Sequence, residues 1–280
     1  MSCFSNYSSK KALDHLYSNS RPITYVPPTT LYIGLLRDDN GLANNTPSEQ
    51  DEVAGGSYVR MPLDGVVNYF RPATNFEALL HADVDWPVAT ENWGTVTHAA
   101  LFDSVTGGNV LMWSPLTTAK MIETNDIMGI RATDLVASLA SVGMSSYSAK
   151  KMLDHLLANG RAQVYTPPSS LYVALFTSSG GLSANDPALQ TEVAGGAYVR
   201  KILNGVANYM GPAADFAAAL HADINWEIAT SNWGTITHLA IMDTELGGNV
   251  IAFGALTSPK VIETNDRAVV KAGQLVASLT

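Results

Sequence analysis

The feature that most constrains this chain is an internal repeat with a period of half its length. The segment Asn92–His98 (NWGTVTH) returns as Asn232–His238 (NWGTITH) in a chain of 280 residues. When residues 1–140 are laid over residues 141–280 without a gap, 72 of the 140 positions are identical. Solenoid repeats have periods of roughly 20–50 residues, so a repeat this long predicts that each copy has its own core.

The sequence therefore predicts two homologous domains, residues 1–140 (copy one) and residues 141–280 (copy two). The linker expected between them, at about residues 140–146, is short. Hydrophobic residues make up 46% of the chain, which is enough to fill two cores. Charged residues make up only 15%, and a surface so poor in charge favours a protein that buries surface against partners.

The balance of charge excludes several classes of partner. The chain carries 25 acidic residues against 16 scattered basic residues, for a net charge of −9. Nucleic acids and anionic membrane surfaces are bound by clustered Lys and Arg, so we expect neither partner. We find no apolar run of about 18 residues and no signal-peptide pattern, so we expect no membrane span. The single cysteine, Cys3, rules out an intrachain disulfide and fits a reducing cytosol.

Short apolar runs between turn residues favour strands along most of each copy. In copy one the expected strands cover residues 31–36, 58–60, 84–88, 95–102, 110–113 and 135–139. A Gly-Gly-Asn turn before residue 110 predicts a hairpin, and the adjacent Gly55 and Gly56 predict a turn or bulge. Copy two repeats these patterns.

Helix and loop signals are fewer. Ser8–Tyr17 predicts a short helix capped by Ser8 or Ser9, and Ser148–Leu157 predicts its counterpart. Phe76–His81 favours one or two helical turns. The polar residues 37–51 and 115–126 predict loops.

About seven or eight short strands per copy, with turn signals about ten residues apart, are typical of a β-sandwich. Little helix remains for parallel crossovers, so we expect antiparallel pairing. We predict a mainly β protein of two tandem, homologous antiparallel β-sandwich domains. Each is jelly-roll-like and begins with a short helix.

All six histidines fall at matched positions of the two copies: His15, His81 and His98, then His155, His221 and His238. Matched histidines can indicate a metal site, but only His81-Ala82-Asp83 and its copy offer ligands at suitable spacing. We favour hydrogen-bonded structural histidines and expect no metal.

Two acids near glycine turns are also retained, Glu52 and Asp103, with Glu192 and Asp243 in copy two. Two carboxylates facing one cleft can hydrolyse a glycosidic bond. Acids beside such turns commonly accept hydrogen bonds from backbone amides instead, which is the interpretation that we favour. The sequence contains no Ser-His-Asp pattern, phosphate-binding loop or dinucleotide fingerprint, so we expect neither catalysis nor a cofactor.

The tryptophans recur as well: Trp86, Trp93, Trp226 and Trp233 are matched, whereas Trp113 becomes Phe253. Exposed aromatic residues can stack on sugars or anchor an interface, but alternation within strands predicts that these fill the sandwich core. The loop Asp38-Asp39-Asn40 resembles a calcium loop. Because copy two does not repeat it, we expect it to be solvated.

Four segments, in this order, resemble a family of tailed-bacteriophage proteins. In copy one they are Tyr25–Leu35 (YVPPTTLYIGL), Glu52–Arg60 (EVAGGSYVR), Ala89–His98 (ATENWGTVTH) and Gly107–Leu111 (GGNVL). The resemblance covers nearly the full length of each half, and the usual family member resembles one copy. Members are described as tail-fibre-like or as virion structural proteins. The resemblance implies a non-enzymatic virion component, assembled in the host cytoplasm.

Two positions on a phage particle fit this resemblance. We predict a head-decoration (cement) protein that binds the major capsid protein and stabilises the assembled shell. A trimer of such chains would place six similar domains around a threefold axis. The alternative is a tail or baseplate fibre-like component, bound to tail proteins, that contributes to attachment to a host receptor. The lack of heptads and of short shaft repeats argues against a long fibre.

Overall fold

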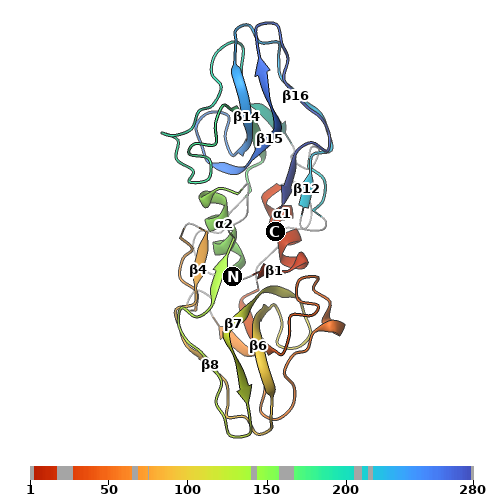
Figure 1. Ribbon diagram of the computed structural model, residues 1–280, viewed down its shortest axis with the longest axis vertical. Coiled ribbons are helices and arrows are strands. Elements are labelled where there is room, and N and C mark those ends of the chain that lie inside the picture. Colours follow the sequence, from red (N-terminus) through yellow and green to blue (C-terminus); the bar gives the residue numbers. More distant parts are fainter. Residues whose placement is uncertain are drawn as a thin grey trace.

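The computed structural model describes residues 3–17, 28–64, 69–74, 76–139, 144–157, 167–204, 210–213 and 217–278. The molecule is elongated, with the strands of the two copies at opposite ends and two helices between them (Figure 1). The predicted fold class is confirmed, because the described residues form antiparallel sheets in two similar halves. Each described helix has twelve residues, and neither is long and apolar enough for a membrane span.

The elements of copy one are β1 (Cys3–Phe4), α1 (Asn6–Tyr17), β2 (Thr30–Leu36), the 3-10 turn η1 (Pro47–Glu49), β3 (Met61–Asp64), β4 (Glu77–Leu79), β5 (Val84–Asp85), β6 (Gly94–Phe102), β7 (Val110–Ile122), β8 (Gly129–Ile130) and β9 (Val136–Ser138). Those of copy two are α2 (Ser146–Leu157), β10 (Ser170–Phe176), β11 (Lys201–Asn204), β12 (Ala217–Ala219), β13 (Ile224–Asn225), β14 (Gly234–Met242), β15 (Val250–Ile262), β16 (Val269–Val270) and β17 (Val276–Ser278).

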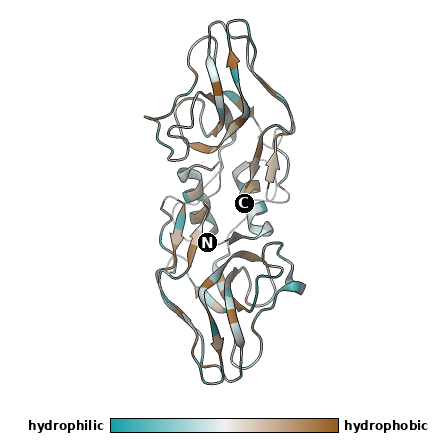
Figure 2. Ribbon diagram, in the orientation of Figure 1, coloured by the Kyte–Doolittle hydropathy of each residue, from teal (hydrophilic) through white to brown (hydrophobic). Residues whose placement is uncertain are grey.

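Among the described residues, each copy has one main sheet and two small ones. The main sheet of copy one has the strand order β1-β7-β6-β2-β3, and that of copy two has the order β11-β10-β14-β15. The small sheets pair β4 with β9 and β5 with β8, then β12 with β17 and β13 with β16. Buried residues from main and small sheets belong to one hydrophobic cluster, so the core lies between these layers. Figure 2 shows hydrophobic residues on the strands of both halves.

Several predicted elements are confirmed with small shifts at their ends. The two helices, the strands at residues 31–36 and 95–102 and the Gly-Gly-Asn hairpin are all present. Ser5 caps α1, however, because its hydroxyl accepts a hydrogen bond from the Ser8 backbone N–H at 3.2 Å. The prediction of Ser8 or Ser9 as the cap was therefore wrong, since the helix begins two residues earlier, at Asn6.

Three local predictions were wrong because pairing between distant segments decides the structure. Glu77–Leu79 is a strand, not a helical turn, since it pairs with β9. The predicted loop at residues 115–126 is strand as far as Ile122, because β7 rejoins β6 after a bulge. The strand expected at residues 58–60 begins only at Met61.

The predicted strand at residues 84–88 is shorter than expected. β5 ends at Asp85, although the Trp86 backbone N–H still donates to Met128 at 2.9 Å. The last strand runs from Val136 to Ser138 instead of residues 135–139. Residues 140–143 of the predicted linker lie outside the described residues.

One hydrophobic cluster runs through both copies. It contains Leu13, Leu31 and Trp93 of copy one together with Met152 and Leu171 of copy two. Each copy also has a small cluster of its own on the other face of its main sheet, around Phe102 in copy one and around Phe176 in copy two. The two copies thus share most of the buried apolar surface, while the boundary near residue 140 remains a sequence-based prediction.

Candidate functional site

In copy one, the Gly55-Gly56 turn brings the buried Arg60 against the partly buried Glu52. Both glycines have positive φ, 89° and 54°, which lets the chain turn sharply between Glu52 and Arg60. The Arg60 guanidinium donates through Nε to Glu52 Oε1 at 2.8 Å and through Nη2 to Glu52 Oε2 at 2.6 Å. This bidentate geometry is the strongest arrangement of the two groups.

Arg60 also fixes the neighbouring hairpin. Its Nη1 donates to the carbonyl oxygens of Ser104 at 2.8 Å and Gly107 at 2.7 Å. The guanidinium carbon lies 3.4 Å from the centroid of the Phe102 ring. The side chain of Arg60 is 5% exposed, so this charge is stabilised by its partners and not by water.

Tyr58 completes the network. Its hydroxyl donates to Glu52 Oε1 at 2.9 Å and accepts from the Leu35 backbone N–H at 2.9 Å. Burial raises the pKa of Tyr58 well above its ordinary value, and the nearby Glu52 charge raises it further. The ring is therefore neutral in ordinary buffers, and it packs edge-on against Trp93 with centroids 5.5 Å apart.

Copy two repeats the network almost atom for atom. Arg200 holds Glu192 at 2.8 and 2.6 Å, and Tyr198 donates to the same carboxylate at 3.0 Å. Sequence reasoning singled out Glu192 and its counterpart Glu52 but missed their arginine partners. The available signal was the retention of both members, eight residues apart, in two copies that differ at nearly half of their positions.

The other retained acid, Asp103 in copy one and Asp243 in copy two, closes the hairpin turn of its own copy. Asp103 accepts from the Asn109 backbone N–H at 2.6 Å and from the Asn109 side-chain amide at 2.7 Å. Asp243 makes the same two bonds to Asn249, at 2.6 and 2.8 Å. Asp103 therefore accepts a hydrogen bond from a backbone amide, as predicted. Glu52 instead accepts hydrogen bonds from an arginine side chain, so the prediction was wrong for this residue.

The histidines occupy three different settings. His15 and His155 stack on each other in the centre of the molecule. His98 Nδ1 lies 2.7 Å from Thr97 Oγ1 and His238 Nδ1 lies 2.8 Å from Thr237 Oγ1. His81 donates its backbone N–H to Tyr69.

Asp83, the carboxylate beside His81, pairs with Arg131 at 3.1 Å. Its pKa is lowered, first by the Ala132 backbone N–H and then by Arg131. Within the described ranges, no three His, Cys, Asp or Glu side chains are grouped so as to hold a metal ion.

The four matched tryptophans are core residues, as predicted, with exposed fractions of 0–5%. They are Trp86, Trp93, Trp226 and Trp233. Trp113 is only partly buried and lies beside His98. In the loop Asp38-Asp39-Asn40, the Asp38 carboxylate accepts from the Asn40 backbone and side chain, which forms a local turn.

Copy one contains a cleft of about 300 Å³ beside the outer part of β7. Its floor is apolar and buried, with Ala99, Met128 and Leu135. Its rim is exposed and polar, with Thr117, Lys120 and Asp134. An ammonium, a carboxylate and a hydroxyl around an apolar floor suit a small ligand that has both hydroxyl groups and C–H faces.

The corresponding place in copy two is built differently. Ala99 faces Ser114 across the β6–β7 ladder, whereas Leu239 faces Gly254 across β14–β15. Leu239 is buried like Ala99 but has a larger side chain, and the cavity that it lines with Gly254 has a volume of only about 70 Å³. Asp134 is replaced by Gln274, while the lysine is retained as Lys260. The polar rim and open floor are therefore features that copy one does not share in full with copy two.

Comparison with protein families recognises both copies. A family model described as "Podophage GP4 fiber I protein gp80" matches residues 3–138 and again residues 143–278. The two matches together cover nearly the whole chain and have the same spacing as the sequence repeat. No curated protein shows significant similarity to the chain. The resemblance to phage structural proteins is thus confirmed, and the description as a fibre favours the fibre alternative over head decoration.

Proposed function

Because the chain belongs to this family of podophage fibre proteins, we propose that it is a non-enzymatic structural component of a phage tail fibre. The observation that carries the proposal is the double match, since the family model matches each copy over nearly its full length. The bonding of the retained acids supports a structural role. Glu52 and Asp103 are both held in hydrogen bonds that fix turns of the same half.

The position on the particle can be tested directly. Antibodies raised against the purified protein can locate it on purified virions by immunogold electron microscopy. A fibre component should be labelled at the tail, in a copy number of at most a few dozen that follows the tail symmetry. Label spread over the head, with copies on the order of hundreds, would contradict the proposal.

The partners in this proposal are other proteins of the particle, most directly those of the tail or baseplate. Assembly in the host cytoplasm remains a prediction, as does the trimer suggested by the sequence. Light scattering of the purified protein measures the oligomer directly. A mass three times that of the 29.8 kDa chain is the expected result for a trimer.

We further propose that a fibre with this chain touches the host surface through the cleft of copy one. The mixed rim of Lys120, Thr117 and Asp134 supports a saccharide ligand, because sugars present hydroxyl groups to polar side chains and C–H faces to an apolar floor. The cleft volume of about 300 Å³ is at the small end of the range for ligand sites.

Matched variants separate this contact from general damage to the fibre. Lys120→Ala alters the cleft, whereas Lys260→Ala removes the lysine at the same position of copy two. Phage with Lys120→Ala should adsorb to host cells more slowly, and phage with Lys260→Ala should adsorb normally. The double variant Ala99→Leu with Ser114→Gly fills the floor with the pair that copy two tolerates. Normal adsorption of both cleft variants would exclude the cleft as the contact and leave the tail location standing.

A further inference from the structure

The two helices meet on a pseudo-twofold axis. The rings of His15 and His155 stack with centroids 3.9 Å apart and planes 11° apart, and both residues are buried. They occupy the same position in the two copies, 140 residues apart. A residue contacts its own counterpart only where a twofold axis passes between them, so this stack marks the axis.

The contacts around the axis are reciprocal. Asp14 Oδ1 accepts from the Ala213 backbone N–H at 2.9 Å, and Asp154 Oδ1 accepts from the Ala73 backbone N–H at 2.8 Å. Each carboxylate thus reaches from the helix of one copy to the chain that leads into a small sheet of the other copy. Contacts of this kind, in which i meets j and j meets i, define an isologous interface.

The start of each helix is attached to its own copy. Ser148 Oγ on α2 donates to the Ile251 carbonyl of β15 at 2.6 Å, and Ser8 on α1 makes the matching bond to Leu111 of β7. Each helix therefore begins on the main sheet of its own copy and ends against a small sheet of the other. Neither helix can bury its apolar face within one copy alone.

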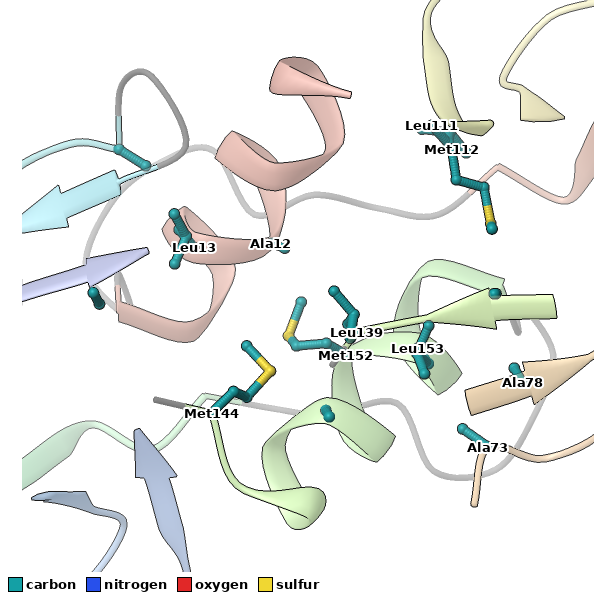
Figure 3. Close-up of a cluster of buried hydrophobic side chains, with 14 of the residues drawn as sticks. Ala12, Leu13, Ala73, Ala78, Leu111, Met112, Leu139, Met144, Met152 and Leu153 are labelled. Atoms are coloured by element: carbon teal, nitrogen blue, oxygen red, sulfur yellow. The ribbon is translucent and has the colours of Figure 1, made fainter. Parts of the chain in front are cut away.

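The two copies carry side chains of different size at one matched position of this interface. Copy one has Ala12 where copy two has Met152, and both are fully buried in the shared cluster. Figure 3 shows the Met152 side chain extending from α2 toward α1 near Ala12. A pair of two copies one would leave a void here, and a pair of two copies two would crowd two methionines.

We infer that the folding unit is a pair of unlike repeats, and that copy one selects copy two as its partner over a second copy one. The interaction surface is the C-terminal half of each helix with the small sheet that faces it. Its partner is the complementary half, from the same chain or from a second copy of this chain. When the link between the halves is cut, the two pieces stay together, and after separation they recombine as an unlike pair.

The full chain tests this inference when a protease site is inserted within residues 140–143 and cut after folding. Native mass spectrometry and size-exclusion chromatography should show one complex that contains both pieces, with the elution volume of the uncut chain. Unfolding in denaturant and dilution back to buffer should restore mainly the unlike pair. Separate folded pieces, or like and unlike pairs in the proportions of random association, would overturn the inference.

Size-swap variants locate the selectivity at the axis. In the cut protein, Met152→Ala should weaken association of the pieces at least about tenfold, because it leaves a cavity. Ala12→Met alone should weaken it by overpacking. The double variant Ala12→Met with Met152→Ala exchanges the two side chains and should recover most of the affinity.

A double variant no tighter than the weaker single variant would show that the two residues do not select the partner. Thr95→Ala and Thr235→Ala provide the control, since both threonines are exposed and lie on β6 and β14 at matched positions. Neither should change the association of the pieces. A loss of affinity in these controls equal to that of Met152→Ala would likewise contradict selection at the axis.

Discussion

Copy one and copy two share their buried polar network but differ in the apolar pairs around it. The Arg60–Glu52 and Arg200–Glu192 distances agree to 0.1 Å, because a buried charge tolerates no loss of its partner. Apolar residues, in contrast, have changed in compensating pairs. Gly34 lies under Phe102 in copy one, and the corresponding residues of copy two are Ala174 and Met242. Apolar packing thus tolerates a change in one side-chain volume when a neighbour compensates, whereas both members of the ion pair are retained.

The largest effect should come from breaking the shared network. Arg60→Ala removes the cation that pairs with Glu52 and the donor to two carbonyl oxygens, and it should lower the free energy of unfolding by about 3–5 kcal/mol. Arg200→Ala should cost a similar amount. Denaturant titration measures both changes. A loss below about 1 kcal/mol in either copy would show that the network does not hold that half together.

A smaller effect should come from exchanging one member of a compensated pair. A Cβ added at Gly34 would lie 2.9 Å from the Phe102 ring and 3.0 Å from Glu52 Oε1. Gly34→Ala should therefore destabilise the protein by about 1–3 kcal/mol through overpacking. Adding Phe102→Met, which restores the copy-two pair, should recover part of that loss. No recovery in the same denaturant titration would mean that the added methyl group does not clash with Phe102.

Alkaline pH should affect the two copies equally. Burial raises the folded-state pKa of Tyr58 and of Tyr198 above the unfolded value of about 10. Their contribution to stability is complete below pH 10 and is lost as the pH rises toward the folded-state pKa, because the unfolded state releases its protons first. Each tyrosine should lower the free energy of unfolding by about 1.4 kcal/mol per pH unit in that range.

The tyrosine prediction has a matched control. Tyr58→Phe should reduce the alkaline slope by the share of one tyrosine, about 1.4 kcal/mol per pH unit. It should also lower stability at neutral pH, because Leu35 N–H and Glu52 lose a partner. Tyr198→Phe should do the same in copy two. An unchanged slope in either variant would assign the alkaline loss to other groups.

The smallest effect should come from a contact that only copy one has. Arg37 pairs with Asp51 at 2.7 Å, and copy two has Thr177 and Thr191 instead. Both members are substantially exposed, so Arg37→Thr should cost only about 0.2–1 kcal/mol. The cost should shrink further at high salt. A larger loss would show that the bond from Arg37 Nε to the Trp93 carbonyl contributes more than the ion pair does.

Much of the fold could be predicted from residues that act locally. Serines before an amphipathic run indicated the two helices, and apolar runs indicated β2, β6 and the first part of β7. The short strand Glu77–Leu79 could not be predicted, because its partner Val136–Ser138 lies about sixty residues away. The end of β7 was hidden for the same reason, since residues 115–121 are largely exposed and have the polar composition of a loop.

The candidate functional residues also divide into those with a sequence signal and those that only distant contacts bring together. Retention in both copies indicated Glu52, Asp103 and the four matched tryptophans. The structure places the two acids in hydrogen bonds and the tryptophans in the core. The cleft of copy one had no sequence signal, because Ala99, Lys120 and Asp134 come together only when β6, β7 and the β8–β9 segment are in place. The spacing of these residues is not that of any motif.

The sequence by itself determined that this protein is a duplicated, mainly β phage particle protein. The repeat of 72 identical positions gives the duplication, local apolar patterns give the β class, and the resemblance of four segments to a known family gives the phage assignment. None of these needs knowledge of distant contacts. Only the tertiary structure decided how the two copies meet. His15 on His155, Asp14 on Ala213 and Asp154 on Ala73 join residues that are far apart in the chain. Such contacts depend on the relative placement of whole elements, and no pattern of neighbouring residues specifies it.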